Sequence, residues 1–369
     1  MDGGALIGHG RYGCVFDPPL RVISKTSGEC KTIDIPGRIV GKISDPGDVK
    51  NEVEASKILS QIPENLQYFS ILDLKNVNRP CDTAEQKEAD KESLKECPVV
   101  QGARMSDMLH FTMPYSGIGF SKYFNIRLKT NTRIPLEAAI SHLLEGASLM
   151  VLNNFVHYDI HSENILFDKT TNMPRIIDFG FSFSVTNISN ETLDRRWRLY
   201  TPGFPTEAPE IALVQGLRHK LSLNTVIHDI IIGKEPIKMG QFILGMRMDA
   251  QEKSFRSFIN KSKSIQDSNW VSFFKYYWPG FDAWGIGAVI LKIYKHLSQL
   301  PTYTKDPSWS ALSEKIKGIL RGLLRVNPIE RIDCVEALYM FHPESHIFNS
   351  ERATAWIQEK GDFRKPLSV

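Results

Sequence analysis

The chain has 369 residues, of which 45 are Lys or Arg and 42 are Asp or Glu, so its formal net charge is only +3. This balance excludes a strongly basic surface of the kind that binds nucleic acid. Hydrophobic residues make up 42% of the chain, enough for a buried core, and no apolar run approaches the roughly 20 residues of a membrane-spanning helix. We therefore expect neither a nucleic-acid nor a membrane partner, and the oligomeric state stays open.

The cysteines are spread along the chain without a CxxC pair, which gives little support for a metal site. They are Cys14, Cys30, Cys81, Cys97 and Cys334. An odd number of cysteines is typical of a reducing compartment. The N-terminal stretch is too short and too rich in glycine for a signal peptide, so we expect an intracellular, cytoplasmic protein.

The first predicted element is a β-hairpin around a glycine turn. Residues 5–7 and 14–16 read as strands, and the turn between them contains Gly8, Gly10 and Gly13 in a G-x-G-x-x-G-x-V pattern. Glycines let backbone amides approach a phosphate without a Cβ clash. The pattern alone also fits a simple tight turn. A dinucleotide-binding fingerprint would need a helix where a second strand is predicted.

A strand over residues 37–44 places Lys42 between apolar residues, and a helix is predicted over residues 51–62. Lys42 could be a solvated residue of an edge strand. It could also contact nucleotide phosphates if an acidic partner orients it. Glu52 lies on the apolar face of the helix and Glu54 on a more polar face. We favour Glu52 as the partner, with Glu54 as the alternative.

Less regular segments surround these elements. Residues 20–37 read as an extended connection, and the charge-dense residues 80–97 read as a solvated inserted segment. A strand is predicted over residues 109–113, with a flexible joint over 116–119. After residue 135 helical spacing dominates, beginning with a long amphipathic helix over residues 136–152.

The strongest local signal is Asp159 followed by Asn164, with Asp178 arriving later on a glycine turn after an apolar strand. Each pattern alone could be a capped turn, but their order favours chemistry. Asp159 can accept or orient the proton of an attacking hydroxyl. Asn164 and Asp178 offer the hard oxygen ligands that Mg²⁺ prefers when it bridges phosphates.

Three further elements follow: the Ala-Pro-Glu sequence ending at Glu210, Asp282 at the start of an apolar helix, and Arg331 before another helix. Taken together and in order, all these elements resemble the eukaryotic-type protein kinase superfamily from Gly8 to about Phe341. The resemblance implies that Glu210 and Arg331 form a buried ion pair. It also implies that Asp282 ties the loop of the catalytic aspartate to the central helix of its lobe.

The resemblance implies a bilobal α+β fold. Residues 1–116 would form a small lobe with an antiparallel β-sheet and one main helix. Residues 117–345 would form a larger, mostly helical lobe, with a helical insertion over 211–278. Residues 346–369 would be a C-terminal tail.

The resemblance also implies a function: transfer of the γ-phosphoryl group of ATP to protein substrates, with Mg²⁺. The residues that it assigns to ATP binding are Ile7, Gly8, Gly10, Gly13, Val15, Lys42, Met113, Pro114 and Ser116. In this scheme the carbonyl of Pro114 accepts from the adenine amino group, and the amide of Ser116 donates to the ring. Those assigned to catalysis are Lys42, Glu52 and Asp159, and those assigned to the metal are Asn164 and Asp178.

Two departures from the family pattern flank Asp159. Tyr158 replaces the usual arginine that binds a phosphate on the activation segment, which predicts activity without phosphorylation of that segment. His161 replaces the lysine that serine/threonine kinases usually keep near the γ-phosphate, so serine and threonine are the favoured acceptors but tyrosine stays open. We expect Arg195, Arg196 and Arg198, within the segment, to pair locally without anchoring it to the loop.

Two other functions compete with an active protein kinase. A pseudokinase scaffold would predict the loss of Lys42, Asp159 or Asp178, all of which are present. A small-molecule kinase would generally lack the Ala-Pro-Glu element and the Glu210–Arg331 pair. A finer resemblance is to serine/threonine kinases encoded by large DNA viruses of eukaryotes, which would place the protein in the host cytoplasm or the virion.

Overall fold

The computed structural model describes residues 4–10, 13–130 and 132–363. The chain divides into two compact units, the first of which contains the residues up to Gly117 together with 177–182, and the second the remainder. Arg11 and Tyr12 of the predicted glycine turn, and the end of the predicted tail, lie outside the described residues. The mixed helical and strand content, with antiparallel sheets, confirms the coarse α+β prediction.

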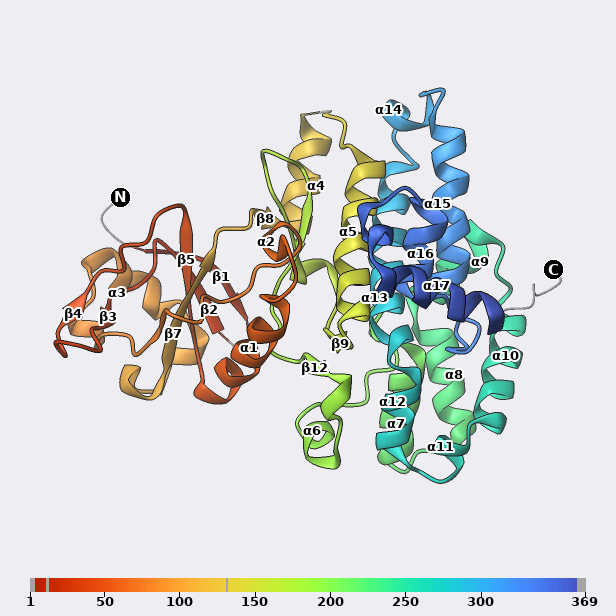
Figure 1. The fold of residues 1–369 in the computed structure, drawn as a ribbon, viewed down its shortest axis with the longest axis horizontal. Helices are drawn as coiled ribbons and strands as arrows, with labels where there is room; N and C mark the ends of the chain where they lie inside the picture. The colour runs from red at the N-terminus through yellow and green to blue at the C-terminus, as the bar shows by residue number, and fades with distance from the viewer. Residues whose placement is uncertain (1–3, 11–12, 131, 364–369) are drawn as a thin grey trace. The chain divides into compact units, whose positions relative to one another are not determined.

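The main sheet of the first unit is antiparallel, with five strands among the described residues in the order β1-β2-β5-β7-β6 (Figure 1). Its strands are β1 (Ala5–Gly10), β2 (Gly13–Asp17), β5 (Ile39–Ser44), β6 (Val77–Asn78) and β7 (Leu109–Pro114). Strands β1 and β2 pair directly, His9 opposite Cys14, which confirms the predicted hairpin. Strand β2 ends at Asp17, before two prolines that cannot donate to a ladder.

The main helix of the first unit, α1 (Pro46–Leu59), begins earlier than the predicted residues 51–62. The side chain of Asp45 accepts a hydrogen bond from the backbone N–H of Gly47 at 2.7 Å. Pro46 suits the first turn of a helix, where its missing N–H costs nothing. Residues 46–50, before the predicted start, therefore form the capped first turn of the helix.

Residues 80–97, predicted to be a solvated insertion, leave most of their side chains at least partly exposed but are also attached to the sheet. It forms a 3-10 turn and α3 (Glu88–Lys95), and disulfides join Cys97 to Cys14 and Cys81 to Cys30. Leu94 is buried in the cluster that includes Cys97 and Cys14. The extended connection expected over residues 20–37 also carries a short hairpin, β3 (Val22–Ile23) and β4 (Cys30–Lys31).

These two disulfides bear on the expectation of a reducing compartment, which rested on the odd number of cysteines. The pairings span sequence separations of 83 and 51 residues, too distant for spacing to reveal. Closing loops of this size restricts the unfolded chain and typically stabilises a fold by about 2–4 kcal/mol per bridge. Four of the five cysteines are thus paired, and the cysteine count no longer supports a reducing compartment; Cys334 stays a buried free thiol.

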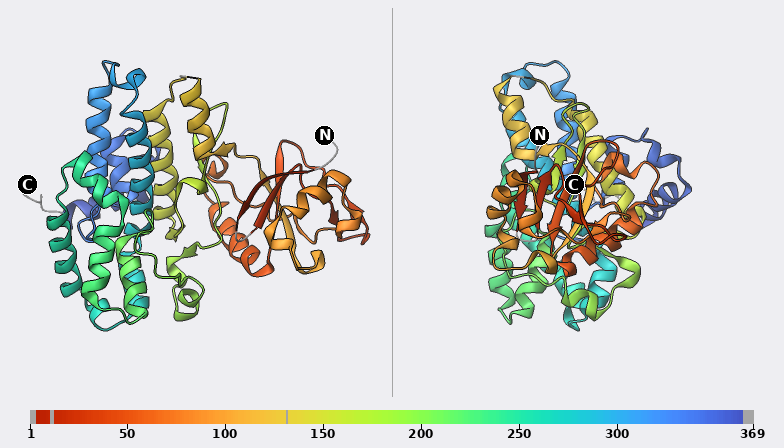
Figure 2. Two further views of the ribbon diagram at one scale, coloured as in Figure 1. Left: turned by 180° about the vertical axis from the view of Figure 1, so that it is seen from behind. Right: turned by 90° about the vertical axis from the view of Figure 1, so that its left-hand side faces the viewer.

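The second unit is mostly helical (Figures 1 and 2). Its helices are α4 (Phe120–Lys129), α5 (Leu136–Leu152), α6 (Asn190–Asp194), α7 (Pro209–Arg218), α8 (Leu223–Gly233), α9 (Glu235–Leu244), α10 (Met248–Lys261), α11 (Lys263–Gln266), α12 (Trp270–Tyr277), α13 (Pro279–Leu297), α14 (Pro301–Thr304), α15 (Trp309–Leu323), α16 (Cys334–Phe341) and α17 (Glu351–Phe363). Short antiparallel pairings join β9 (Phe155–Val156) to β12 (Phe183–Ser184), and β10 (Ile165–Phe167) to both β8 (Ile118–Gly119) and β11 (Pro174–Ile176).

Helix α13 lies at the centre of this unit. Nearly all its residues are buried, including Trp284, and it packs against α5, α15 and α16. Helix α5 has the predicted limits, 136–152. Residues 211–278 are helical, as expected of the proposed insertion. In the described part of the chain no helix is both long and apolar enough to cross a membrane.

Glu210, at the start of α7, and Arg331, before α16, form the predicted buried ion pair. The two guanidinium Nη atoms donate to the two carboxylate oxygens at 2.7 and 2.8 Å, and neither side chain is exposed to solvent. Arg331 also donates to the backbone carbonyls of Gly280 and Arg325. The pair thus joins α7, α13 and the loop before α16.

We expect Glu210→Ala to destabilise the second unit by about 3–5 kcal/mol, because it leaves a buried guanidinium without its counter-ion. Calorimetric melting checks this, with Glu314→Ala as the control, since Glu314 pairs with Lys317 at the exposed surface and its loss should not shift the transition. Adding Arg331→Met to Glu210→Ala should recover part of the loss. Strictly additive single effects would argue against a direct interaction.

Candidate active site

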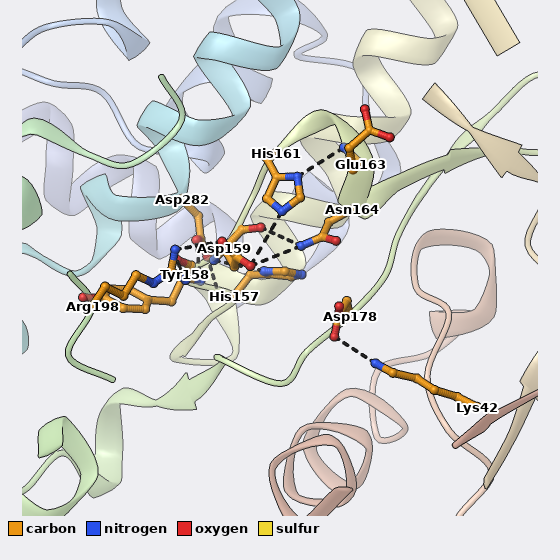
Figure 3. A network of polar contacts seen from close by, with 10 residues as sticks. All are labelled: Lys42, His157, Tyr158, Asp159, His161, Glu163, Asn164, Asp178, Arg198 and Asp282. Carbon is orange, nitrogen blue, oxygen red and sulfur yellow. Dashed lines mark hydrogen bonds and ion pairs between the residues drawn. The ribbon is translucent and has the colours of Figure 1, made fainter. Parts of the chain in front are cut away.

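Within the first unit, the buried Lys42 of β5 contacts two carboxylates, those of Glu52 and Asp178; Figure 3 shows its contact with Asp178. Its Nζ lies 2.9 Å from Glu52 Oε1 and 3.1 Å from Asp178 Oδ1. Helix α1 presents Glu52 on its buried face, whereas Glu54 is exposed. The ion pair favoured from helical spacing is therefore present, and the alternative with Glu54 is not formed.

Two neighbouring carboxylates stabilise the charged form of Lys42. Burial alone would lower the pKa of Lys42, but the carboxylates of Asp178 and Glu52 more than offset it and raise that pKa above its ordinary value. The ammonium group stays protonated. Because two partners fix its position, β5 presents a permanent and oriented cation.

Asp178 sits on a turn whose geometry is set by its neighbours. Its backbone adopts a positive φ of 65°, a conformation that Asp tolerates better than most residues. Phe179 is fully buried and meets the ring of Phe69 edge-on at 6.0 Å. The hydroxyl of Ser182 donates to the Phe179 carbonyl at 2.7 Å. The buried aromatic thus anchors the turn while the Asp178 side chain stays 35% exposed.

The glycines of the β1–β2 hairpin serve two purposes. A Cβ at Gly13 would lie 2.7 Å from the carbonyl oxygen of Ile43 and 2.9 Å from Lys42 Cε, so only glycine lets β2 pack this closely. At Gly8 and Gly10 a Cβ would meet nothing within 4 Å. Those two positions leave open backbone, which suits the approach of a phosphate. Of the other predicted flap residues, Ile7 is half exposed and Val15 pairs opposite Lys42.

The predicted adenine contacts differ in one respect from the sequence-based expectation. The Pro114 carbonyl accepts hydrogen bonds from the hydroxyls of Ser116, at 3.1 Å, and Ser70, at 3.3 Å. A carbonyl oxygen has two lone pairs, so an adenine amino group would have to displace one of these hydroxyls. Met113 lies opposite Val40 in the β5–β7 pairing.

Within the second unit, Asp282 of α13 fixes the loop that carries Asp159. Its two carboxylate oxygens accept hydrogen bonds from the backbone N–H groups of His157, at 2.6 Å, and Tyr158, at 2.8 Å. Tyr158 adopts a positive φ of 68°, which is unfavourable for a bulky side chain. The two backbone hydrogen bonds accepted by the buried Asp282 carboxylate hold it there, as the sequence-based role of Asp282 implied.

Asp159 is oriented by its own loop (Figure 3). The amide nitrogen of Asn164 donates to the backbone carbonyl of Asp159 at 2.9 Å, which leaves the amide oxygen as the group available to a metal. The backbone N–H of Glu163 donates to Nδ1 of His161 at 3.2 Å. The proton of a neutral His161 therefore sits on Nε2, which lies 3.7 Å from Asp159 Oδ2.

A contact that sequence reasoning missed comes from Arg198. Its Nη1 lies 2.8 Å from Asp159 Oδ1, and its Nη2 donates to the Tyr158 carbonyl at 2.9 Å. The expectation that Arg198 would not anchor the segment to the loop is therefore wrong. Burial would raise the pKa of Asp159, but the nearby imidazole of His161 and the charge of Arg198 outweigh it and lower that pKa well below its ordinary value.

The helices after the Ala-Pro-Glu element support the same segment. Tyr200 donates to Asp229 of α8 at 3.1 Å, and the fully buried Lys234, between α8 and α9, donates to the Phe204 carbonyl at 2.7 Å. Burial, partly offset by Glu207, lowers the pKa of Lys234 to about 8. The residues predicted to be an insertion thus contact the activation segment directly.

Each unit contains one of the two oxygen donors predicted for the metal, and either donor alone would need help from a ligand. In the described ranges no three or more His, Cys, Asp or Glu side chains converge as a metal site. Asp178 offers a partly exposed carboxylate and Asn164 an amide oxygen. Hard cations of the Mg²⁺ type commonly take one or two such protein ligands and complete their shell with phosphate oxygens and water.

Comparison with known proteins identifies one family. Residues 49–341, more than half of the chain, match the family model described as the protein kinase domain. No curated protein matches the chain. The matched region begins within α1 and ends with α16, so it contains Glu52, Asp159 and Asp178, while the β1–β2 hairpin and Lys42 lie before it.

Proposed function

The chain belongs to the protein kinase family, and we propose that it transfers the γ-phosphoryl group of ATP to serine and threonine hydroxyls of proteins. The observation that carries this proposal is the buried Lys42 held between Glu52 and Asp178, at 2.9 and 3.1 Å. An ammonium group with two carboxylate partners is a suitable anchor for nucleotide phosphates, because its position and charge are set before the nucleotide arrives.

We propose the following roles for the remaining residues. The β1–β2 hairpin, with Ile7, Gly8, Gly10, Gly13 and Val15, covers the phosphates. Met113, Pro114 and Ser116 contact the adenine ring. Asp159 orients the acceptor hydroxyl and accepts its proton. Its lowered pKa keeps the carboxylate ionised, and therefore able to accept a hydrogen bond, at physiological pH. When Mg²⁺ is bound, through Asn164 and Asp178, it supplies neutralisation of phosphate charge.

The choice of acceptor rests on the resemblance to serine/threonine kinases, and it can be tested directly. The protein is incubated with γ-labelled ATP, Mg²⁺ and a mixture of dephosphorylated proteins, and the labelled products are hydrolysed to amino acids. The proposal predicts phosphoserine and phosphothreonine. Label found on tyrosine alone would overturn the choice of acceptor but not the family.

We also propose that the enzyme works without phosphorylation of its activation segment. Tyr158 offers no positive charge for a segment phosphate, and Tyr200 and Phe204 are already held by Asp229 and Lys234. We expect phosphatase treatment to leave the rate unchanged. Alanine at the hydroxyl residues far from the expected substrate-binding turn should also have no effect; these are Ser184, Thr186, Ser189 and Thr192. A large loss on dephosphorylation, restored by phosphate at one segment residue, is the contrary result.

The finer assignments stay proposals as well. They comprise the lobe limits at residues 116 and 345, the insertions over 80–97 and 211–278, a cytoplasmic or virion location, and a viral lineage. The contacts of residues 80–97 with the sheet support a structural purpose for that segment. The contacts of Asp229 and Lys234 with the segment support a positioning purpose for the later one.

A further inference from the structure

The loop around Asp159 lacks the fixed cations that its family resemblance would supply. Tyr158 is a phenol, and His161 is an imidazole whose Nε2 lies 3.7 Å from Asp159 Oδ2. In the described part of the chain, the closer charge comes from Arg198, 2.8 Å from Asp159 Oδ1. Arg198 belongs to the activation segment and lies 39 residues further along the chain.

Arg198 is attached to the loop by two hydrogen bonds. One Nη of Arg198 donates to the carboxylate of Asp159 and the other to the carbonyl of Tyr158, at 2.8 and 2.9 Å. The two donors of a planar guanidinium therefore fix both the direction of the side chain and its distance from the loop. The side chains of Arg198 and Asp159 are only 17% and 18% exposed, so solvent screens their attraction weakly.

Tyr158 affects this contact in two ways. It leaves the loop without its usual cation, and its ring lies beside the guanidinium of Arg198. The centre of its ring lies 5.0 Å from Arg198 Cζ, within the range of a cation–π contact. The residue that removes the usual loop cation thus provides a surface for a cation arriving from the segment. Neither residue alone would indicate that the two side chains meet.

The position of Arg198 does not depend on a phosphate. On one side, Trp197 meets Phe274 of α12 edge-on at 5.7 Å and stacks under Arg218 of α7 at 3.6 Å. On the other side, the Tyr200 hydroxyl donates to Asp229 at 3.1 Å. Packing on both flanks holds the backbone of Arg198, which is the condition for a preorganised charge.

We propose that Arg198 is the positioning residue for Asp159, supplying from the activation segment the cation that the loop lacks. The inference rests on the proposed kinase function. Arg198 holds Oδ1 of the carboxylate, which leaves Oδ2, on the side of His161 and Asn164, to meet the acceptor hydroxyl. The same contact ties the order of the segment to the geometry of the loop.

The test compares Arg198→Met, Arg198→Lys and Arg195→Met, with ATP and dephosphorylated casein as substrates. Arg195 is the matched control, because it is half exposed, directly follows α6 and pairs with Glu191 of that helix. We expect Arg198→Met to lower kcat by about 10–100-fold, the effect of losing one charge-assisted hydrogen bond. The KM for ATP should hardly change, because Arg198 does not touch the nucleotide.

Arg198→Lys should restore part of the loss, since an ammonium can satisfy only one of the two acceptors well. Arg195→Met should behave as the wild type. An Arg198→Met enzyme with unchanged kcat would overturn the proposal. A higher kcat would overturn it too, because the contact would then restrain Asp159 instead of positioning it.

Hydrogen exchange of residues 183–206 provides a second readout that needs no activity. If the wild type transfers no phosphate, the proposed function fails, but hydrogen exchange still tests whether the contact between Arg198 and Asp159 holds the segment in place. Arg198→Met should then speed exchange across the segment, and Arg195→Met should not. Equal exchange in the wild type and Arg198→Met would overturn the anchor, whatever the activity.

Discussion

Replacing Asp178 with asparagine is expected to lower phosphoryl transfer by about 10³-fold or more while the protein stays folded. An amide is a poor ligand for a hard divalent cation and cannot neutralise its charge, and metal assistance in such reactions is worth several kcal/mol. Lys42 keeps its ion pair with Glu52 at 2.9 Å, so the buried ammonium group still has a carboxylate partner. The change is close to isosteric, and packing around Phe179 should persist.

The measurement is kcat with saturating ATP and Mg²⁺, together with a melting curve. Asp82→Asn is the matched control, since Asp82 is an exposed aspartate of the same unit whose side chain caps no helix. A folded Asp178→Asn protein with near-normal turnover would remove Asp178 from the mechanism. It would also remove the reason for assigning metal binding to the turn that carries Asp178.

Lys42→Met should have an effect of similar size, for a different reason. The variant keeps the aliphatic stem and deletes the charge that Asp178 and Glu52 hold in place. Removing one preorganised donor to a developing charge typically costs about 10²–10³-fold in kcat. ATP binding should fall less than turnover, because the cation matters most as phosphate charge redistributes.

This variant also leaves two carboxylates without their shared cation. Removing one partner of a buried ion pair can cost about 3–5 kcal/mol, so a folding defect must be separated from a catalytic one. Lys42→Arg keeps the charge but presents a planar fork in place of a compact ammonium. It should fold well and remain strongly impaired. Lys57→Met, at an exposed lysine of α1, is the control. Unimpaired turnover by Lys42→Met would show that the strand lysine has been misassigned.

Local periodicity predicted much of this molecule. The apolar spacing of α5 defined its limits, and the spacing on α1 separated Glu52 on the buried face from the exposed Glu54. The predicted hairpin around the glycine turn also follows from local pattern. In each case the information lies within a single helix or a single pair of neighbouring strands. The Glu210–Arg331 pair was predicted because the order of the motifs matched a family, although its partners lie far apart in sequence.

Contacts between distant segments that no family motif marks were beyond sequence reasoning. Nothing in the spacing of Cys14 and Cys97 indicated that they meet, because the meeting depends on how α3 packs on the sheet. The occupied carbonyl of Pro114 depends on Ser70, which no motif marked. Arg198 was visible as one of several arginines in the segment, yet its contact with Asp159 depends on the packing of Trp197 and Tyr200. A loop without its usual cation beside an arginine-rich segment was the one available clue.

The central claim, that this chain is an active protein kinase, is tested most directly by comparing the wild type with Asp159→Asn. Both proteins are purified after phosphatase treatment and incubated with Mg²⁺, dephosphorylated casein, and ATP labelled at either the γ- or the α-phosphate. We predict that label enters casein from γ-labelled ATP and not from α-labelled ATP, and that Asp159→Asn abolishes the transfer while still folding. A folded wild-type protein that binds ATP but labels casein no faster than Asp159→Asn would contradict the claim and indicate a nucleotide-binding scaffold.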